Sequence, residues 1–362
     1  MARVLSIFLC LFSLAQTSGA APWKFFMFGD TRDADKPVNT NILAELSAEI
    51  IRQSPAFAFV AGDLVLSGSL ESFEIWTNVI APVRAAGIAV YPIAGNHDAP
   101  DLTDYAAVFG PWVPSNGPAG EISLTYSLVV SNSLVLAFDH NVHPHLLNQA
   151  WMDAVLLTNT QPHVFAFGHE PAFKVLHADC LGTYPAARDT FWRSLARARG
   201  RLYFAGHDHF YDHMRLDDGD GNPDNDLHQF IVGTGGSPIY GDAPYDGDNG
   251  AWTPVRIFHE AVFGYVMVTV DGLNVSVQWW RRLPTGTYSA SEEVFSYTAA
   301  PPPLKLFVNV SPGRMQLWWA DGILQSAPAL RGPYSDVAGA ASPVVVTNFT
   351  TAPCFYRLRS TQ

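Results

Sequence analysis

Charged residues, clusters of basic residues and long apolar runs are all scarce in this chain of 362 residues. Charged residues make up 15% of it and apolar residues 48%, so the composition argues against disorder and favours a sizeable buried core. The formal net charge is −12, without a long run of either sign. Because a nucleic-acid-binding face needs clustered lysine and arginine, no nucleic acid partner is expected. The acidic excess suits bound cations instead.

One apolar stretch, VLSIFLCLFSLA, stands behind Arg3 at the N-terminus. It is too short to span a bilayer and has the length of the core of a secretory signal peptide. Small residues follow it, so residues 1–20 are predicted to be a signal peptide, cleaved after about Ala20, of a secreted or periplasmic protein. A short membrane anchor is the alternative. No later run predicts a membrane span.

Cysteine is also rare. Cys10 would leave with the signal peptide, which leaves Cys180 and Cys354. An oxidising compartment permits a disulfide between them, but their separation in sequence does not give their distance in space. Two free buried thiols are the alternative, and no pairing is predicted.

Short apolar runs alternate with amphipathic stretches between Trp23 and His209. Strands are predicted at 24–28, 56–61, 89–94, 134–140, 163–168 and 201–206, and helices at 39–53, 70–87, 101–110, 146–157 and 186–200. This alternation is typical of βα units and buried sheets. After about residue 210, strand-like runs follow with little helix, which we interpret as a second sheet packed on the first. The predicted fold over 21–298 is α/β, with two packed mixed sheets flanked by helices.

Three prolines at 301–303 indicate a stiff linker over 299–303. Short strand-like runs follow, so residues 304–362 are predicted to form a small, sandwich-like all-β module. The segment LQSAPALRGPYSDV, the Ser-Pro pair near 342 and the closing FYRLR make this tail similar to a C-terminal β module of many secreted bacterial proteins. The resemblance implies attachment to a surface or polymer, or stabilisation. A simple packing extension is the alternative.

Five apolar runs of the large domain end in glycine and then in a residue that can bind a metal. These residues are Asp30; Asp63; Asn96, His97 and Asp98; His169; and His207 and His209. Open α/β sheets place ligand sites at the carboxyl ends of their strands. Glycine there lets the chain turn sharply and lets the site approach the backbone. Each piece alone is explained by a turn or a buried histidine, so the prediction depends on all five together.

The donor types narrow the choice of ion. Mixed Asp, Asn and His donors suit Mn, Fe or Zn and are too rich in nitrogen for calcium. Cysteine is absent from the set, which argues against a structural zinc site.

The order GD…GD…GNHD…GH…GHDH resembles the calcineurin-like metallophosphoesterases over about residues 23–297. The resemblance implies two divalent or trivalent transition metal ions side by side over a pair of sheets. One ion would be held by Asp30, Asp63 and His209, and the other by Asp63, Asn96, His169 and His207, with Asp63 bridging. His97 would lie just outside the ions, with Asp98 orienting it.

These residue types suit phosphoester hydrolysis. Two adjacent metal ions clamp a phosphoryl oxygen and lower the pKa of a shared water, so that hydroxide attacks phosphorus in line. A departing alkoxide needs a proton, which imidazole is well matched to give near neutral pH, so His97 is the predicted general acid. We therefore expect a secreted two-metal hydrolase of a small phosphoester, with a monoesterase preferred. The alternatives are a phosphodiesterase of the same fold, or a binding protein that kept the fold and lost the chemistry.

Arg32 departs from the family pattern, because many members carry a histidine ligand at this place. A guanidinium stays protonated and has no lone pair, so it is not a ligand. Two interpretations stay open: Arg32, together with Asn96, contacts the substrate phosphate, or Arg32 pairs with a neighbour such as Asp33 or Asp35. Leu66 stands where purple acid phosphatases carry a metal-binding tyrosine, so no tyrosinate ligand is expected.

Other polar clusters permit two interpretations each. The alternating residues of 217–226 suggest either a calcium loop or a solvated hairpin tip, and the candidate ligands are Asp218, Asp220, Asn222 and Asp224. Pro223 stands where a helical calcium loop has its glycine. Three histidines, His140, His143 and His145, are interpreted as a polar rim of the pocket or as extra ligands. His177 lies in a loop that could cover the site, and GTGG at 233–236 either lets a loop pass near the metals or forms a plain turn.

Overall fold

The computed structural model describes residues 21–242, 250–300, 304–319, 321–347 and 354–360. The predicted signal peptide at 1–20 and the three linker prolines at 301–303 lie outside the described residues. Within the described ranges, no helix has the length and apolar character needed to cross a membrane.

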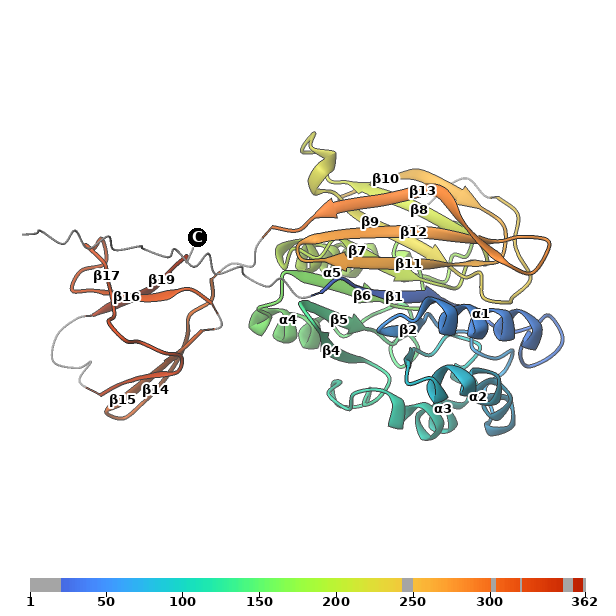
Figure 1. Cartoon of the computed structure of the whole chain (residues 1–362), viewed down its shortest axis with the longest axis horizontal. Coiled ribbons are helices and arrows are strands. Elements are labelled where there is room, and N and C mark those ends of the chain that lie inside the picture. The colour runs from blue at the N-terminus through green and yellow to red at the C-terminus, as the bar shows by residue number, and fades with distance from the viewer. Residues whose placement is uncertain (1–20, 243–249, 301–303, 320, 348–353, 361–362) are drawn as a thin grey trace, which may run out of the picture.

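Two large mixed sheets form the centre of the larger body (Figure 1). The first sheet contains, in spatial order, β13 (Tyr288–Thr298), β12 (Asn274–Arg282), β11 (Gly264–Asp271), β1 (Trp23–Phe28), β2 (Phe57–Val60) and β3 (Ala89–Pro92). The second contains β10 (Thr253–Glu260), β8 (Tyr211–Asp217), β9 (Leu227–Val232), β7 (Leu202–Ala205), β6 (His163–Phe167), β5 (Ser133–Ala137) and β4 (Tyr126–Val130).

Helices cover the outer faces of both sheets (Figure 1). The first sheet packs against α1 (Thr40–Gln53), α2 (Leu70–Ala85) and α3 (Leu102–Phe109), and the second against α4 (Gln149–Thr158) and α5 (Pro185–Arg197). Short 3-10 helices lie at Ala99–Asp101, Gly110–Trp112, Leu181–Thr183 and Pro223–Asn225. The predicted α/β fold with two packed mixed sheets between helices is confirmed.

Strand β1 shows why its sequence is apolar without a break. Side chains alternate across a strand, and Phe25 and Met27 enter the core between the two sheets. Phe26 and Phe28 enter the core under the helices of the first sheet. All four are fully buried, because a strand covered on both faces needs apolar residues at every position.

The predicted division of strands between the sheets is wrong. Strands after residue 210 do not form a sheet of their own: β8, β9 and β10 join the second sheet, whereas β11, β12 and β13 join the first. The reason lies at β1, which pairs in parallel with β2 on one edge and antiparallel with β11 on the other. Backbone hydrogen bonds pair β1 with these two strands. Such bonds do not depend on the side chains, so the apolar pattern of a strand does not predict its partner.

The C-terminal region is all-β, as predicted. Its strands form two three-stranded antiparallel sheets, and they are β14 (Phe307–Ser311), β15 (Arg314–Trp318), β16 (Ile323–Ala327), β17 (Ser335–Asp336), β18 (Val344–Val346) and β19 (Phe355–Arg359). A small core contains Leu317, Trp319 and Leu324. In Figure 1 this region lies beside the larger body, next to the end that carries α4.

The two cysteines of the described residues are both free. Cys180 is buried and Cys354 is exposed. The interpretation as free thiols therefore agrees with the structure, but burial holds only for Cys180.

A buried polar cluster links the two sheets away from the strand ends discussed below. The Nδ1 atom of His213 on β8 lies 2.7 Å from Glu293 Oε1 on β13, and its Nε2 atom lies 2.8 Å from His228 Nδ1 on β9. Burial lowers the pKa of His228 to about 2, and the neighbouring His213 and Arg201 lower it further. His228 is therefore neutral in the folded protein at all moderately acidic pH values.

The low pKa of the buried His228 predicts that the folded protein loses stability in acid. Its folded pKa lies below its unfolded pKa, so its contribution is fully present above about pH 6.5 and is lost as the pH falls below that value. As the pH is lowered from about 6.5, the free energy of unfolding should fall less steeply in His228→Gln than in the wild type. The two slopes should differ by up to about 1.4 kcal/mol per pH unit. Urea unfolding at several pH values measures the slope. The control is His143→Gln at an exposed position, and a slope equal to that of the wild type in His228→Gln would contradict the prediction.

Candidate metal centre

The carboxyl ends of neighbouring strands bring the predicted ligands to one end of the sandwich. The loops after β1 and β2 run side by side, because Asp30 N donates to Gly62 O at 2.9 Å and Thr31 N donates to Asp63 O at 2.9 Å. Trp76 of α2 donates from Nε1 to Thr31 Oγ1 at 2.9 Å, which ties both loops to the helix layer.

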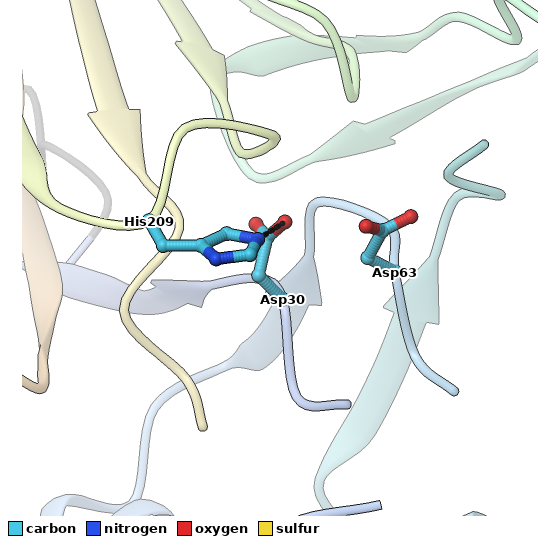
Figure 2. Close-up of side chains that lie close together, drawn as sticks. All are labelled: Asp30, Asp63 and His209. Carbon is cyan, nitrogen blue, oxygen red and sulfur yellow. Dashed lines mark ion pairs between the residues drawn. The ribbon is translucent and has the colours of Figure 1, made fainter. Parts of the chain in front are cut away.

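The first group of candidate ligands consists of Asp30, Asp63 and His209 (Figure 2). One ligand atom of each lies within 4.8 Å of the others, and all three residues are buried. Figure 2 shows the imidazole of His209 directed at the Asp30 carboxylate, with Asp63 beside them. The distance from His209 Nε2 to Asp30 Oδ1 is 3.5 Å.

The second group consists of Asp63, Asn96, His169 and His207. His169 Nε2 lies 3.0 Å from Asn96 Oδ1 and 3.3 Å from Asp63 Oδ1. His207 Nδ1 lies 3.2 Å from both Asn96 Oδ1 and His169 Nε2. Asp63 therefore lies between the two groups, where a bridging carboxylate is predicted.

The histidine tautomers leave lone pairs pointing into these groups. Carbonyl oxygens only accept, so Nδ1 of His169 donates to Ala61 O at 2.7 Å and Nδ1 of His209 donates to Pro238 O at 2.9 Å. Burial, with Arg32 adding to it, lowers the pKa of His209 to about 3. Burial also lowers the pKa of His169 to about 4, against an opposing effect of Asp63. Both rings are neutral near pH 7, which is the form that binds metal.

The spacing of these atoms fits a transition metal ion. The lone pair of His169 Nε2 faces the acceptor Asn96 Oδ1 at 3.0 Å, a contact that is repulsive unless a cation lies between them. Metal bonds of about 2.1 Å that meet at right angles place ligand atoms about 3.0 Å apart. Carboxylate, amide and imidazole donors are the types that Mn, Fe and Zn accept.

Backbone strain is concentrated at the same residues. Asp30, Asp63 and His207 have φ angles of 59°, 50° and 71°, a region that residues other than glycine seldom adopt and that is enriched at functional sites. Glycine is needed beside them, because a Cβ on Gly206 would lie 2.3 Å from Asp30 Oδ2, and one on Gly95 would lie 2.2 Å from Asp63 Oδ1. The close approach predicted for the glycines at the strand ends is present.

His97 is partly buried beside the second group. Its main-chain N–H donates to Asp63 Oδ1 at 3.0 Å, and its Nδ1 lies 2.7 Å from Leu66 O. The carbonyl accepts, so Nδ1 carries the hydrogen and Nε2 is left free.

The prediction that Asp98 orients His97 is wrong. The buried Asp98 carboxylate accepts from the main-chain N–H groups of Gly95 at 2.8 Å and of Leu64 and Val65 at 3.1 Å. Both of its oxygens are occupied in holding the loops after β2 and β3 together. Asp98 thus positions the backbone that carries Asp63, Asn96 and His97, and the Leu66 carbonyl holds the His97 ring.

Arg32 lies at the first group. Its Nε atom is 3.5 Å from Asp63 Oδ2 and its Nη2 atom is 3.5 Å from His209 Nε2. From Asp33 it meets only the main-chain carbonyl, at 3.5 Å. The predicted ion pair with Asp33 or Asp35 is therefore replaced by one with Asp63, whereas the contact with a substrate phosphate stays a prediction.

Four residues at the site were absent from the predicted set of ligands and catalytic groups: Asp208, His177, Asp179 and Tyr240. Asp208 accepts from His177 Nδ1 at 2.6 Å and from two main-chain N–H groups of the same loop, which fixes that loop beside the His207 ring. Asp179 Oδ1 lies 3.5 Å from His207 Nε2, and the Tyr240 ring stacks on His209 at 4.2 Å. Asp208 was visible within GHDH, and His177 was expected only in a loop over the site. Asp179 and Tyr240 acquire their places through loop conformation, which no motif marks.

The three histidines at 140–145 differ in exposure, and the glycine-rich segment at 233–236 approaches the site. His140 is buried and accepts from Glu170 N at 3.2 Å, so the interpretation as a polar rim is wrong for it, whereas His143 is exposed. His145 Nδ1 lies 3.0 Å from Glu170 Oε1. Gly233 passes beside the site, because a Cβ on it would lie 2.9 Å from Asp30 Oδ2.

The acidic loop at 217–226 forms a cluster that differs from the predicted calcium ligands. Asp217, Asp218 and Asp226 lie within 4.8 Å of one another, and only Asp218 belongs to the predicted four. Arg215 pairs with Asp226 and lies 3.5 Å from Asp217 Oδ2. The arginine already neutralises part of this cluster, and calcium here stays a prediction.

Three solved structures share the fold of this chain. Purple acid phosphatase PPD1 from yellow lupin (Lupinus luteus) seeds is 15% identical with a TM-score of 0.58, over 77% of this chain and 54% of that one. PhoD is 12% identical with a TM-score of 0.56, over 78% and 70%. GAP50, the anchor in the inner membrane complex of Plasmodium, is 14% identical with a TM-score of 0.54, over 77% and 90%. The matched region thus spans about half of the lupin enzyme.

No curated protein sequence matches the chain at a significant level. The family model of the calcineurin-like phosphoesterases matches residues 24–211. That range begins in β1, ends in β8 and includes every residue of the two groups. The chain therefore belongs to the calcineurin-like phosphoesterase family.

Proposed function

We propose that the protein is a secreted or periplasmic metal-dependent phosphoester hydrolase that prefers phosphomonoesters. The observation that carries this proposal is the convergence of buried carboxylates and imidazoles, together with the Asn96 amide, into two adjoining groups that share Asp63. The residues of the first and second groups would hold the two transition metal ions expected of this family. When bound, such ions polarise the phosphoryl group and lower the pKa of the attacking water.

The residues of the chain have separate tasks in this reaction. Asp63 offers one oxygen to each group, since Oδ1 faces His169 at 3.3 Å and Oδ2 faces Arg32 at 3.5 Å. The Nδ1–H of His97 is bonded to the Leu66 carbonyl, so a second proton would be held at Nε2. In this imidazolium form the ring would donate the Nε2 proton to the departing alkoxide and return to the neutral tautomer. Asp98 holds the loops of both residues in place through main-chain N–H groups.

The preference for monoesters rests on charge. A monoester carries a second negative charge that a diester lacks, and the Arg32 guanidinium at the first group favours the more highly charged phosphate. Asn96 is exposed at the same end of the sheets and is a second candidate for phosphate contact.

Secretion and surface attachment rest on the sequence. Residues 1–20 have the pattern of a signal peptide. The β module at 304–362 is proposed either to attach the enzyme to a surface or polymer, or to stabilise it.

The proposal is tested by metal analysis and by assays of nitrophenyl mono- and diesters with Mn, Fe and Zn. We expect bound metal, faster turnover of the monoester, loss of activity with a chelator and recovery when the metal is restored. Faster turnover of the diester would favour a phosphodiesterase. Bound metal without turnover would favour a binding protein, and the absence of both would contradict the proposed function.

A further inference from the structure

Arg32 reaches the atoms that the first group would offer to an ion. Asp63 Oδ1 is turned toward His169 and the His97 N–H, so Oδ2 is the oxygen left for the first group. That oxygen lies 3.5 Å from Arg32 Nε, and the lone pair of His209 Nε2 lies 3.5 Å from Arg32 Nη2. The guanidinium and an ion in the first group would therefore share one carboxylate oxygen and one imidazole nitrogen.

The Arg32 side chain is held in this position. Only 12% of it is exposed, and its buried Nε atom finds no hydrogen-bond acceptor among the described residues. A buried guanidinium without full hydrogen bonding is costly unless nearby negative charge compensates it. The nearest negative charge is Asp63, with which it forms an ion pair.

The second group has the opposite surroundings. Beyond its own donors, the Asp179 carboxylate lies 3.5 Å from His207 Nε2 and adds negative charge. Four donors converge there, compared with three in the first group. Both the number of donors and the nearby charge favour a cation in the second group over one in the first.

The charges of the predicted ligands also favour one metal ion over two. Asp30 and Asp63 are the only carboxylates among them, and an arginine keeps its charge at every physiological pH. Two divalent ions together with Arg32 would place five formal positive charges against those two carboxylates. One ion and Arg32 would place three, which lowers the excess of positive over negative charge in the free site from three to one. Like charges at short range in a buried site repel strongly.

We propose that Arg32 takes the place of one metal ion. The chain holds one transition metal ion tightly, in the second group, and the Arg32 guanidinium supplies the positive charge at the first group. This inference rests on the proposed function, and it replaces an equal pair of ions by one ion and one fixed organic cation. The planar guanidinium then faces the position at which a phosphate oxygen would meet the first ion.

The experiment counts Mn²⁺ ions bound to the purified, chelator-treated protein and to three variants. Arg32→Gln removes the charge, Arg32→His replaces it by a neutral ligand, and Arg52→Gln on α1 is the control, at a more exposed side chain that pairs with Glu49. We expect one tight ion in the wild type and in the control. We expect a second ion in both Arg32 variants, with a dissociation constant at least about a hundredfold lower than any second ion in the wild type. Electron paramagnetic resonance separates an isolated Mn²⁺ from an exchange-coupled pair without any assay of activity.

The outcomes separate this inference from the proposed function. Two ions of equal affinity in the wild type would overturn it, and so would variants that gain no second ion. The count in the wild type decides the matter even if a variant fails to fold. No bound ion in any of the proteins would overturn the proposed function and this inference together, whereas two equal ions with full turnover would overturn the inference alone.

Discussion

Exchange of Asp63 for asparagine is expected to release bound metal and to remove nearly all phosphoesterase activity. The variant keeps the shape of the side chain but loses its charge and replaces one oxygen by an N–H donor. Asp63 is the residue that both groups share, with Oδ1 3.3 Å from His169 Nε2 and Oδ2 3.5 Å from Arg32 Nε. Loss of an outer partner of a metal ligand already costs about 10- to 100-fold. We therefore expect kcat/KM for nitrophenyl phosphate to fall by more than about 100-fold.

The matched control for this variant is Asp35→Asn, the same chemical change at an exposed carboxylate three positions beyond Arg32. It should retain metal and turnover within about twofold, since exposed substitutions away from structural features change little. Metal content is measured by elemental analysis and turnover by release of nitrophenol. Retention of metal and rate in Asp63→Asn would contradict the bridging role, and an equal loss in both variants would point to a general effect of charge.

The convergence of the site residues could be anticipated because it follows from topology. Parallel strands in βα units end at the same edge of a sheet, so residues that follow glycine at those ends meet whatever the loops do. Asp30 and Asp63 follow the parallel pair β1 and β2, and His169 follows β6. The glycines are specific signals too, since a side chain on Gly206 would collide with Asp30.

The contacts around these residues could not be anticipated, because main-chain groups make many of them. His97 is held by the carbonyl of Leu66, and Asp98 is occupied by three N–H groups. Every residue has such groups, so no sequence pattern distinguishes the ones used. The pairing of β1 with β11 escaped prediction for the same reason.

Contacts between side chains of loops far apart in sequence could not be predicted either. Arg32 was compared with its neighbours in sequence, Asp33 and Asp35, but its partners are Asp63 and His209. His209 is 177 residues away along the chain. Tyr240 reaches the same histidine from a loop that carries no motif. Such contacts depend on the exact course of loops, which apolar periodicity does not report.

Removal of the His97 side chain is expected to slow catalysis while leaving the metal in place. In His97→Ala the main-chain N–H that donates to Asp63 Oδ1 remains, because it does not depend on the side chain. The imidazole itself bonds through Nδ1 to the Leu66 carbonyl and contributes no atom to either group. Metal content should therefore equal that of the wild type.

The loss of rate should depend on the leaving group. A general acid contributes about 10²- to 10⁴-fold where the departing oxygen needs a proton, so an alkyl phosphate should lose about that factor in kcat. Nitrophenolate leaves without a proton, and its phosphate ester should lose much less. Replacement of the exposed His143 by alanine is the control and should change neither substrate.

Metal content and the rates with the two esters together distinguish three roles for His97: metal ligand, phosphate-binding group and proton donor. A single rate cannot distinguish them. A ligand to the metal would, when removed, lower metal content and slow both esters alike. A group that binds only the substrate phosphate would raise KM for both esters and keep their ratio of kcat values. A proton donor alone slows the poor leaving group selectively and leaves the metal count unchanged. Equal losses for the two esters in His97→Ala would show that the proton comes from elsewhere, and the free Nε2 of this ring would then need another explanation.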